Sequence, residues 1–433
     1  MKISAFILAV FIALLFMSTI FNTEEIHHSE CSHTPISSLL TDNQSIEAAD
    51  KPICKDYLDY APSLKYTDHT PMRYYKINVH IMKSKDGSTN FDEVLGKKYV
   101  ERVVRIANYK LRNNKQMKLP EGNNTPVIPT QFQYVLTGQE GDSSDDGIYF
   151  HYDDETAYFN KKGKPYSTFD KTQYERYGIG KEEIQNVFLV EHHPDSIASS
   201  TYKPSADGVG MRHWAKLASA YHHMSVEARN NKDPFELSAS VFAGLFNHEL
   251  GHSLGLNHTW STNDGCDDTP KNSNCWSGPA CSNNVMDYNN TNSAYSPCQI
   301  GKVHYNFSKT KSAQRKKLVR DWCEKDPKST ITIGRKERVH WNASKDLRGD
   351  IIIEKGGELK ISCTLNMPSN SCITVEPGGV LVLDGCTIAN DCGATWRGIK
   401  LPSKGKKKGK VIEENEANIQ NVSQSMMGSF KLK

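Results

Sequence analysis

Apolar and polar positions begin to alternate along this chain near Arg73. Residues 75–82 (YKINVHIM) alternate in the manner of a strand with one buried face. Three further runs have the same strand-like character. They lie at 131–136, 148–152 and 186–191. The chain from about residue 71 onward is therefore expected to contain a β-sheet.

Helical periodicity accompanies these strands. One set of apolar residues recurs at the i, i+3, i+4, i+7 spacing of a helix face. It consists of Val100, Val103, Val104, Ala107 and Leu111. Helices are also predicted at about 237–253 and 312–323, with a loop region rich in Asn, Asp, Ser, Gly and Cys at 259–300. This order of strands and helices predicts a mixed α+β domain.

The pattern changes after residue 330. Residues 351–362 and 373–384 match with a 22-residue offset, and each copy reads strand, Gly-Gly turn, strand. A Cys-Thr pair follows both copies. A short strand repeat of this period predicts a β-solenoid, in which each coil buries its apolar face on the next. Two hairpins of a small sandwich are the alternative. Two to three coils are visible.

Length and composition agree with a chain of several parts. A chain of 433 residues exceeds one ordinary domain, and 37% hydrophobic with 24% charged residues is typical of globular proteins. The expected parts are a signal peptide or anchor at 1–21, a pro-segment or linker at 22–70, the α+β domain at 71–328, the β-repeat module at 329–403 and a polar tail at 404–433.

The N-terminus predicts export. Lys2 precedes an apolar run from Ile3 to Phe21, which is typical of a signal sequence. The run is long enough to span a bilayer, and no Ala-x-Ala site follows it, so cleaved secretion and an N-terminal anchor both stay open. Eleven cysteines fit an exported protein with disulfides. We expect a secreted or cell-surface protein.

The overall charge excludes some partners. Against 50 acidic residues there are 53 basic ones, which leaves +3, too little to indicate a nucleic-acid or anionic-membrane partner. The basic run Lys404–Lys410 (KGKKKGK) is interrupted by glycine and is interpreted as a solvated loop. No membrane contact is expected beyond the N-terminal segment, and the oligomeric state stays open.

One segment carries a metal-binding pattern. His248 and His252 are four residues apart, so on a helix they face the same way and can bind one ion. Glu249, next to the first ligand, can reach a water on the metal without being a ligand. Gly255 permits the left-handed turn that would bring His258 to the same ion. Three protein ligands with one open position indicate a catalytic zinc site.

This segment resembles the elongated zinc motif of the metzincin metallopeptidases. Residues 283–288 (NNVMDY) look like the Met-containing turn of that clan. Residues 267–270 (DDTP) and the neighbouring cysteines are similar to the pappalysin-like, or cytophagalysin, branch. The resemblance spans roughly residues 70–325. It implies a metzincin-like zinc peptidase domain ahead of the all-β module, and an endopeptidase that hydrolyses proteins or peptides with Glu249 as general base.

The resemblance also implies roles for single residues. Met286 would pack under the three imidazoles, and the Tyr288 hydroxyl would stabilise the oxyanion of the transition state. The substrate would dock in extended form on a sheet edge, for which we expect the 186–191 strand. Three acidic residues could bind calcium, as in related enzymes, although an acidic loop in water needs no ion. They are Asp264, Asp267 and Asp268.

Four cysteines surround this motif. The family pattern suggests that they form two disulfides, although four cysteines allow three connectivities. The suggested pairs are Cys266–Cys281 and Cys275–Cys298.

Two alternatives concern activity. A pro-segment cysteine, Cys31 or Cys54, could ligate zinc and keep the enzyme latent; a disulfide between the two is favoured in an oxidising compartment. The competing function is an adhesion or binding protein with a catalytically silent metzincin-like domain.

Overall fold

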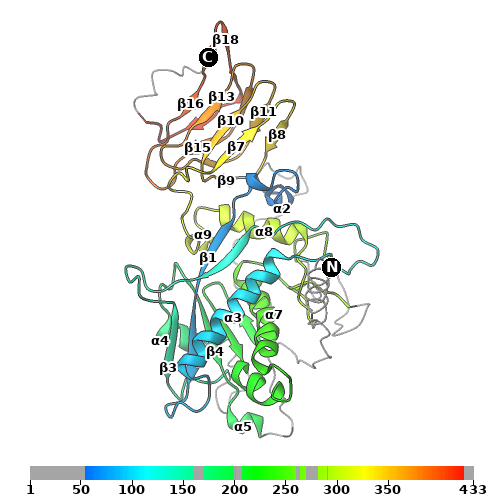
Figure 1. The fold of residues 1–433 in the computed structure, drawn as a ribbon, viewed down its shortest axis with the longest axis vertical. Helices are drawn as coiled ribbons and strands as arrows, with labels where there is room; N and C mark the ends of the chain where they lie inside the picture. Colours follow the sequence, from blue (N-terminus) through cyan, green and yellow to red (C-terminus); the bar gives the residue numbers. More distant parts are fainter. Residues whose placement is uncertain are drawn as a thin grey trace, which may run out of the picture.

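The computed structural model describes residues 54–159, 169–198, 200, 207–259, 264–269, 281–289 and 291–423. An α+β domain and a β-solenoid follow one another along the long axis (Figure 1). The expected signal peptide or anchor at 1–21 and two of the cysteines singled out above, Cys31 and Cys275, lie outside the described residues.

The α+β domain is built on one sheet with the strand order β2-β1-β4-β6-β5, and β3 also pairs with β1. Every pair is parallel except β5–β6. The strands are β1 Arg73–Lys83, β2 Phe132–Leu136, β3 Ile148–Tyr152, β4 Gln185–Val190, β5 Gly208–Gly210 and β6 Trp214–Ala218. The four strands predicted from the sequence are confirmed to within two residues, whereas β5 and β6 were not predicted.

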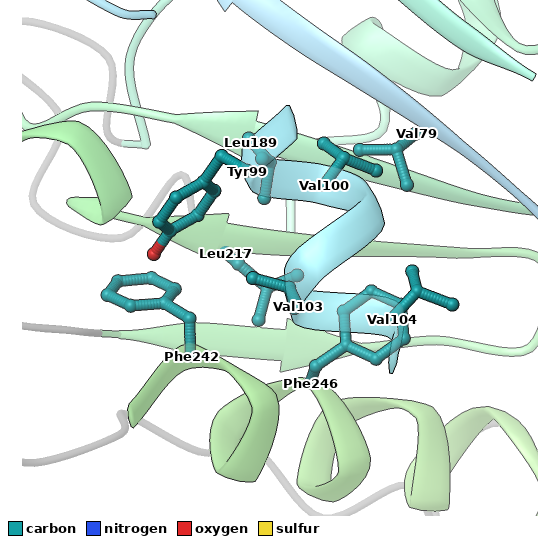
Figure 2. A pocket seen from close by; sticks show the side chains of 9 residues that line it. All are labelled: Val79, Tyr99, Val100, Val103, Val104, Leu189, Leu217, Phe242 and Phe246. Atoms are coloured by element: carbon teal, nitrogen blue, oxygen red, sulfur yellow. The ribbon is translucent and has the colours of Figure 1, made fainter. Parts of the chain in front are cut away.

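Two long helices, α3 (Glu93–Arg112) and α7 (Pro234–Ser253), pack on one face of the sheet. Asp92 caps α3 by accepting from the Leu95 amide, and Asp233 caps α7 in the same way. The apolar core fills the space between the two helices and the sheet, around a small cavity (Figure 2). Nine side chains line it: Val79, Tyr99, Val100, Val103, Val104, Leu189, Leu217, Phe242 and Phe246. The apolar face predicted for the first helix is thus a core face.

The remaining helices are shorter. They are α2 Tyr57–Tyr60, 3-10 helix η2 Thr67–His69, α4 Thr172–Tyr177, α5 Pro194–Ile197, α6 Ala220–His222, π-helix η3 His223–Glu227, α8 Pro297–Ser308 and α9 Ala313–Lys316. No helix in the described ranges is both long and apolar enough to cross a membrane.

Two helices in the C-terminal part of the α+β domain differ from the prediction. Helix α8 was missed, although Ser296 and Gln299 form a capping box at its start. The helix predicted at 312–323 is wrong beyond α9. There the backbone pairs with β1 instead: the Lys76 amide donates to the Lys317 carbonyl at 2.8 Å, and Val319 donates to Tyr74 at 2.9 Å. Backbone hydrogen bonds to the sheet replace those of a helix.

The C-terminal module is a β-solenoid. Three sheets each stack four strands, in the orders β16-β13-β10-β7, β19-β14-β11-β8 and β20-β15-β12-β9, and all these pairs are parallel. Ile351 lies opposite Ile373 and Leu359 opposite Leu381, which is the 22-residue offset of the sequence. The solenoid prediction is confirmed, and the sandwich alternative is wrong.

The solenoid strands are short. They are β7 Thr330–Ile333, β8 Arg338–Trp341, β9 Lys345–Asp346, β10 Asp350–Ile353, β11 Glu358–Ile361, β12 Leu365–Asn366, β13 Ile373–Val375, β14 Val380–Asp384, β15 Thr387–Ala389, β16 Ile399–Lys400, β19 Lys410–Asn415 and β20 Asn418–Ile419, with a hairpin of β17 Ser403–Lys404 and β18 Lys407–Lys408 between β16 and β19.

The polar tail expected at 404–433 is wrong in its first part, because residues after 404 form further strands of the solenoid. Strands β19 and β20 pair with the third coil, so the module has four stacked coils and continues past this boundary. The β17–β18 hairpin is inserted into the fourth coil. It lengthens the sequence offset between paired residues of the third and fourth coils, so that Leu381 lies opposite Val411. The insertion breaks the 22-residue period by which the earlier coils were found.

Residues 54–70 belong to the folded part of the chain. The boundary expected at residue 70, between a pro-segment or linker and the α+β domain, is therefore too far along the chain. Helix α2 of this segment packs on α8, where two tyrosines meet the ring of Tyr305. Asn342 of the first coil donates to Asp59 at 2.6 Å. Cys54 forms a disulfide with Cys363 of the solenoid. Cys54 is therefore paired neither with Cys31 nor with a metal.

Buried charges join the domain to the solenoid. Arg315 donates to Asp346 at 2.7 Å and to Asp391 at 2.5 Å, and Arg73 also contacts Asp346. Trp322 lies beside both guanidinium groups, 4.6 Å from that of Arg315 and 5.4 Å from that of Arg73. Because breaking a buried ion pair leaves an uncompensated charge, this network resists separation of the two parts.

Candidate active site

The last turns of α7 and the segment after it bring the three predicted ligands together. Nε2 of His258 lies 3.1 Å from Nε2 of His248 and 3.1 Å from Nε2 of His252. All three side chains offer a ring nitrogen within 4.8 Å of the others. A tetrahedral zinc ion with Zn–N bonds of about 2.05 Å holds its ligand nitrogens roughly 3.3 Å apart. The spacing fits a zinc ion.

Hydrogen bonds to backbone carbonyls fix two of the imidazoles. Nδ1 of His248 lies 2.6 Å from the Val285 carbonyl oxygen, and Nδ1 of His252 lies 2.9 Å from that of Leu256. A carbonyl only accepts, so Nδ1 carries the proton and Nε2 turns a lone pair to the centre. Burial lowers the pKa of His252 to about 4, which keeps it neutral. A proton on Nε2 of His258 can be donated to Nε2 of His248 or to Nε2 of His252, but not to both. A metal ion at the centre would accept the lone pairs of all three Nε2 atoms.

Gly255 makes the turn that the sequence predicts. Its φ is +95°, in the left-handed region. The Leu256 amide donates to the Gly251 carbonyl at 2.9 Å, which closes the end of the helix. A Cβ at Gly255 would lie 2.4 Å from Nδ2 of Asn306. Both the backbone conformation and the neighbouring side chain therefore favour glycine here.

The predicted Met turn lies beneath the helix. Met286 is fully buried, and its Sδ would be 2.3 Å from a Cβ placed on Gly251. The Met286 amide donates to Oδ1 of Asn284 at 2.8 Å, and its carbonyl accepts from Thr259 at 3.3 Å. Gly251 thus permits the close approach of the turn to the helix that carries the ligands.

The two predicted catalytic side chains have different neighbours. The Tyr288 ring is centred 5.1 Å from that of His258 and 6.0 Å from that of His248. Glu249 is buried and faces β5: a Cβ on Gly208 would lie 2.4 Å from its Oε1, and one on Gly210 would lie 1.9 Å from its carbonyl oxygen. Neither glycine was predicted to belong to the site, and their i, i+2 spacing was the available signal for a close backbone approach.

Comparison with protein families decides the class of this site. The model of reprolysin-like metallopeptidases of family M12B matches residues 200–313. That span contains the three histidines, the glutamate and the Met turn. The chain contains a metzincin metallopeptidase domain. It is accordingly a zinc metalloendopeptidase, a hydrolase.

Solved structures similar to the metzincin domain include two of mirolysin. Mature mirolysin of Tannerella forsythia in complex with a cleaved peptide is 14% identical, with a TM-score of 0.37, and the match covers 57% of this chain and 96% of that one. Mirolysin in complex with compound 9 is 15% identical, with a TM-score of 0.39 and the same coverage of 57% and 96%.

A mutant of Tannerella forsythia promirolysin is also similar, at 12% identity, a TM-score of 0.38 and coverage of 57% of this chain and 84% of that one. No curated protein sequence matches this chain significantly. The narrower likeness of the metzincin domain to the pappalysin-like branch stays a prediction.

The disulfide pairing suggested by the family pattern is wrong. Cys266 is bonded to Cys298, not to Cys281. Cys281 is itself disulfide-bonded, and Cys275 lies outside the described residues. Cys298 lies in the first turn of α8, a helix that was not predicted, and this helix brings it to the 264–269 loop of the metzincin domain.

The acidic loop of the metzincin domain is held by protein donors. Asp264 accepts from the Thr269 hydroxyl at 2.7 Å, and Asp268 accepts from the Ser296 hydroxyl at 2.6 Å. Asp267 is exposed. The Asp268 contact ties the loop to the start of α8, and the Asp264 contact lies within the loop. The described residues give no support to calcium binding.

Proposed function

We propose that this chain is a secreted zinc endopeptidase that cleaves proteins, with Glu249 as the general base. The convergence of three Nε2 atoms, two of them fixed by backbone carbonyls, supports this proposal above all. Three protein ligands leave a coordination position for water. Glu249, adjacent to the first ligand and buried, is the one carboxylate of the motif.

The chemistry is divided between the metal and this chain's side chains. When bound by the three histidines, zinc acts as a Lewis acid and lowers the pKa of a water molecule toward neutrality. Glu249 accepts the proton of the attacking water and later donates it to the leaving amine. The Tyr288 hydroxyl donates a hydrogen bond to the oxyanion. Met286 packs beneath the three imidazoles and forms the apolar base of the site.

Substrate docking needs a different strand from the one expected. Strand β4, which covers the 186–191 prediction, pairs with β1 on one side and β6 on the other, so it is internal. Strand β5 is the last strand on that side of the described sheet. It is also the strand that contacts Glu249. An extended substrate pairing with β5 would pass in front of the general base.

Export is supported by the N-terminal pattern and by the cysteines. Lys2 and the apolar run Ile3–Phe21 are typical of a signal sequence. Within the described ranges, disulfides join Cys54 to Cys363, Cys266 to Cys298 and Cys323 to Cys392. Such bonds persist in oxidising compartments.

Casein digestion tests the proposal against a silent binding protein. Purified chain should cleave casein, lose this activity with a zinc chelator and regain it when zinc is returned. The metal content, measured by atomic emission, should be one zinc per chain. Metal-loaded, folded chain without any cleavage would favour the silent alternative. Cleavage that persists after complete zinc removal would exclude the metal mechanism.

A further inference from the structure

The fourth coil of the solenoid carries a hairpin rich in lysine. Strands β17 and β18 pair antiparallel, and Gly405 makes the turn with a φ of +62°. We call residues 403–408 the lysine hairpin. Its lysines are all exposed: Lys404, Lys406, Lys407 and Lys408. Figure 1 shows β18 at the end of the molecule remote from the metzincin domain. The segment interpreted as a loop is therefore a defined projection.

The turns of the earlier coils lie in register with this hairpin. The Lys336 amide donates to the Gly356 carbonyl at 2.9 Å, Gly356 donates to Gly378 at 2.8 Å, and Gly378 donates to Lys408 at 3.3 Å. Neighbouring parallel strands are about 4.8 Å apart, so these turns form one row along the solenoid axis. The cations of this row make up what we call the basic edge: Arg335, Lys336, Lys355, Lys404, Lys406, Lys407 and Lys408.

The positive charge of the basic edge exceeds the negative charge of its turns. None of its seven side chains takes part in an ion pair with another described residue. The turns carry three glutamates, and one of these, Glu337, accepts from the Gly334 amide at 2.7 Å. Beyond the hairpin, Glu414 is bound by Lys360 at 2.7 Å. The row therefore presents an excess of cations to solvent.

We propose that the basic edge binds a linear acidic polysaccharide that bears carboxylate or sulfate groups. The cations lie along one row, two from the turn of the first coil, one from that of the second and four from the hairpin of the fourth, whereas the turn of the third coil at 376–379 contributes none. A linear polyanion can follow such a row. Lysine, a compact point charge, suits such diffuse contacts better than the bidentate geometry that favours arginine. Binding would attach the peptidase to acidic glycan while leaving the candidate active site, in the other part of the molecule, open.

Other polyanions fit the basic edge less well. Its turns contain no aromatic side chain on which the bases of a single-stranded nucleic acid could stack. None of the exposed large apolar side chains of the described residues lies in the solenoid, so nothing there would insert into a lipid surface.

The test compares two variants of the full chain with equal loss of charge. The first is K404Q/K406Q/K407Q/K408Q. The matched control removes four exposed lysines that form no ion pair with a described residue, as K98Q/K115Q/K232Q/K311Q. The probes are heparin and polygalacturonate, with neutral dextran, phosphatidylglycerol vesicles and a single-stranded thymidine oligonucleotide alongside.

We expect binding to heparin or polygalacturonate with a Kd that rises at least about tenfold in the hairpin variant. A lysine near an anionic membrane surface contributes roughly fivefold, and the same attraction acts near another polyanion. The control should stay within about twofold, and added salt should weaken wild-type binding most. Casein hydrolysis should be unchanged in both variants, which shows that they fold. Which of the two polysaccharides binds identifies the anionic group.

Three outcomes would overturn the proposal. Neither acidic polysaccharide binds the wild-type chain; or both variants lose affinity equally, which indicates net charge alone; or vesicles or the oligonucleotide bind more tightly than either polysaccharide. The experiment does not depend on the proposed peptidase mechanism, because binding can be measured with metal removed.

Discussion

The carbonyl oxygen of Val285 lies 2.6 Å from Nδ1 of His248, so the Met turn holds the first of the three candidate zinc ligands. The next residue, Met286, packs against Gly251 on the same helix. One short turn therefore fixes the tautomer of His248 and packs against the helix that carries it. A hydrogen bond from the second ring nitrogen of a ligand histidine raises the basicity of the ligand nitrogen and sets the orientation of the ring. This coupling explains why the turn and the helix must approach so closely.

Replacing the general base should separate metal binding from turnover. Glu249→Gln keeps the size of the side chain but cannot accept the proton of water. We expect zinc content unchanged and kcat lower by at least about a hundredfold, which is the scale of general-base catalysis. Atomic emission and casein hydrolysis measure the two. Glu236→Gln, on the same helix but paired with Arg102, is the control and should keep its activity. Wild-type turnover in the E249Q variant would exclude Glu249 from the mechanism.

Gly251→Ala should weaken the site through packing. The added Cβ would meet Sδ of Met286 at 2.3 Å. Overpacking of this kind costs about 1–3 kcal/mol of unfolding free energy. Gly244→Ala is the matched control on α7, because its Cβ would meet only the flexible Nζ of Lys110, at 3.3 Å, and Cβ of Asn292 at an ordinary 3.6 Å. Removing a helix glycine there should stabilise the fold by up to about 1 kcal/mol. Chemical denaturation with zinc present measures both; equal effects at the two positions would contradict the packing argument.

Glu191→Gln should alter the dependence of stability on pH. Glu191 is buried, and its carboxyl accepts from the Tyr221 amide at 3.0 Å. Burial raises its pKa from 4.5 to about 8. The folded chain thus holds a proton that the unfolded chain loses near its ordinary pKa. The stabilisation is complete below that ordinary value and disappears as the pH rises through about 8.

The E191Q variant has no such proton to lose. Thermal unfolding between pH 5 and pH 9 should show a smaller fall in Tm for this variant than for the wild type, a window set by the two values of the Glu191 pKa. Glu121→Gln, at an exposed position, should follow the wild type. If the Tm of the E191Q variant and that of the wild type fall in parallel, Glu191 is not the group responsible.

The Cys54–Cys363 disulfide should hold the N-terminal segment on the solenoid. The bond closes 309 residues of sequence, and the loss of a native disulfide typically costs about 2–5 kcal/mol. We expect C54A/C363A to lower Tm and to make the chain between residues 55 and 70 sensitive to a second protease under non-reducing conditions. Cys372→Ala, which removes a buried free cysteine, is the control. Unchanged protection of the segment in the double variant would show that packing on α8 is sufficient.

Features that depend on neighbours along the chain could be predicted from the amino-acid sequence. Three ligands within eleven residues of one helix and its end, the alternation in β1 and the 22-residue repeat of the solenoid all follow from local periodicity. Gly255 belongs with them, because its φ of +95° is a local requirement. These features could be read without knowing which parts of the chain meet.

Features that depend on distant partners required the three-dimensional fold. Cys54 meets Cys363, and Cys266 meets Cys298, because α2 and α8 pack where no local signal places them. The proposed docking strand is β5 and not β4, because β4 is internal to the sheet, and the order in which strands pair leaves no trace in one strand's own sequence. The lysine hairpin joins the basic edge through hydrogen bonds between coils. Contacts across hundreds of residues are set by the packing of whole elements, and single segments do not encode them.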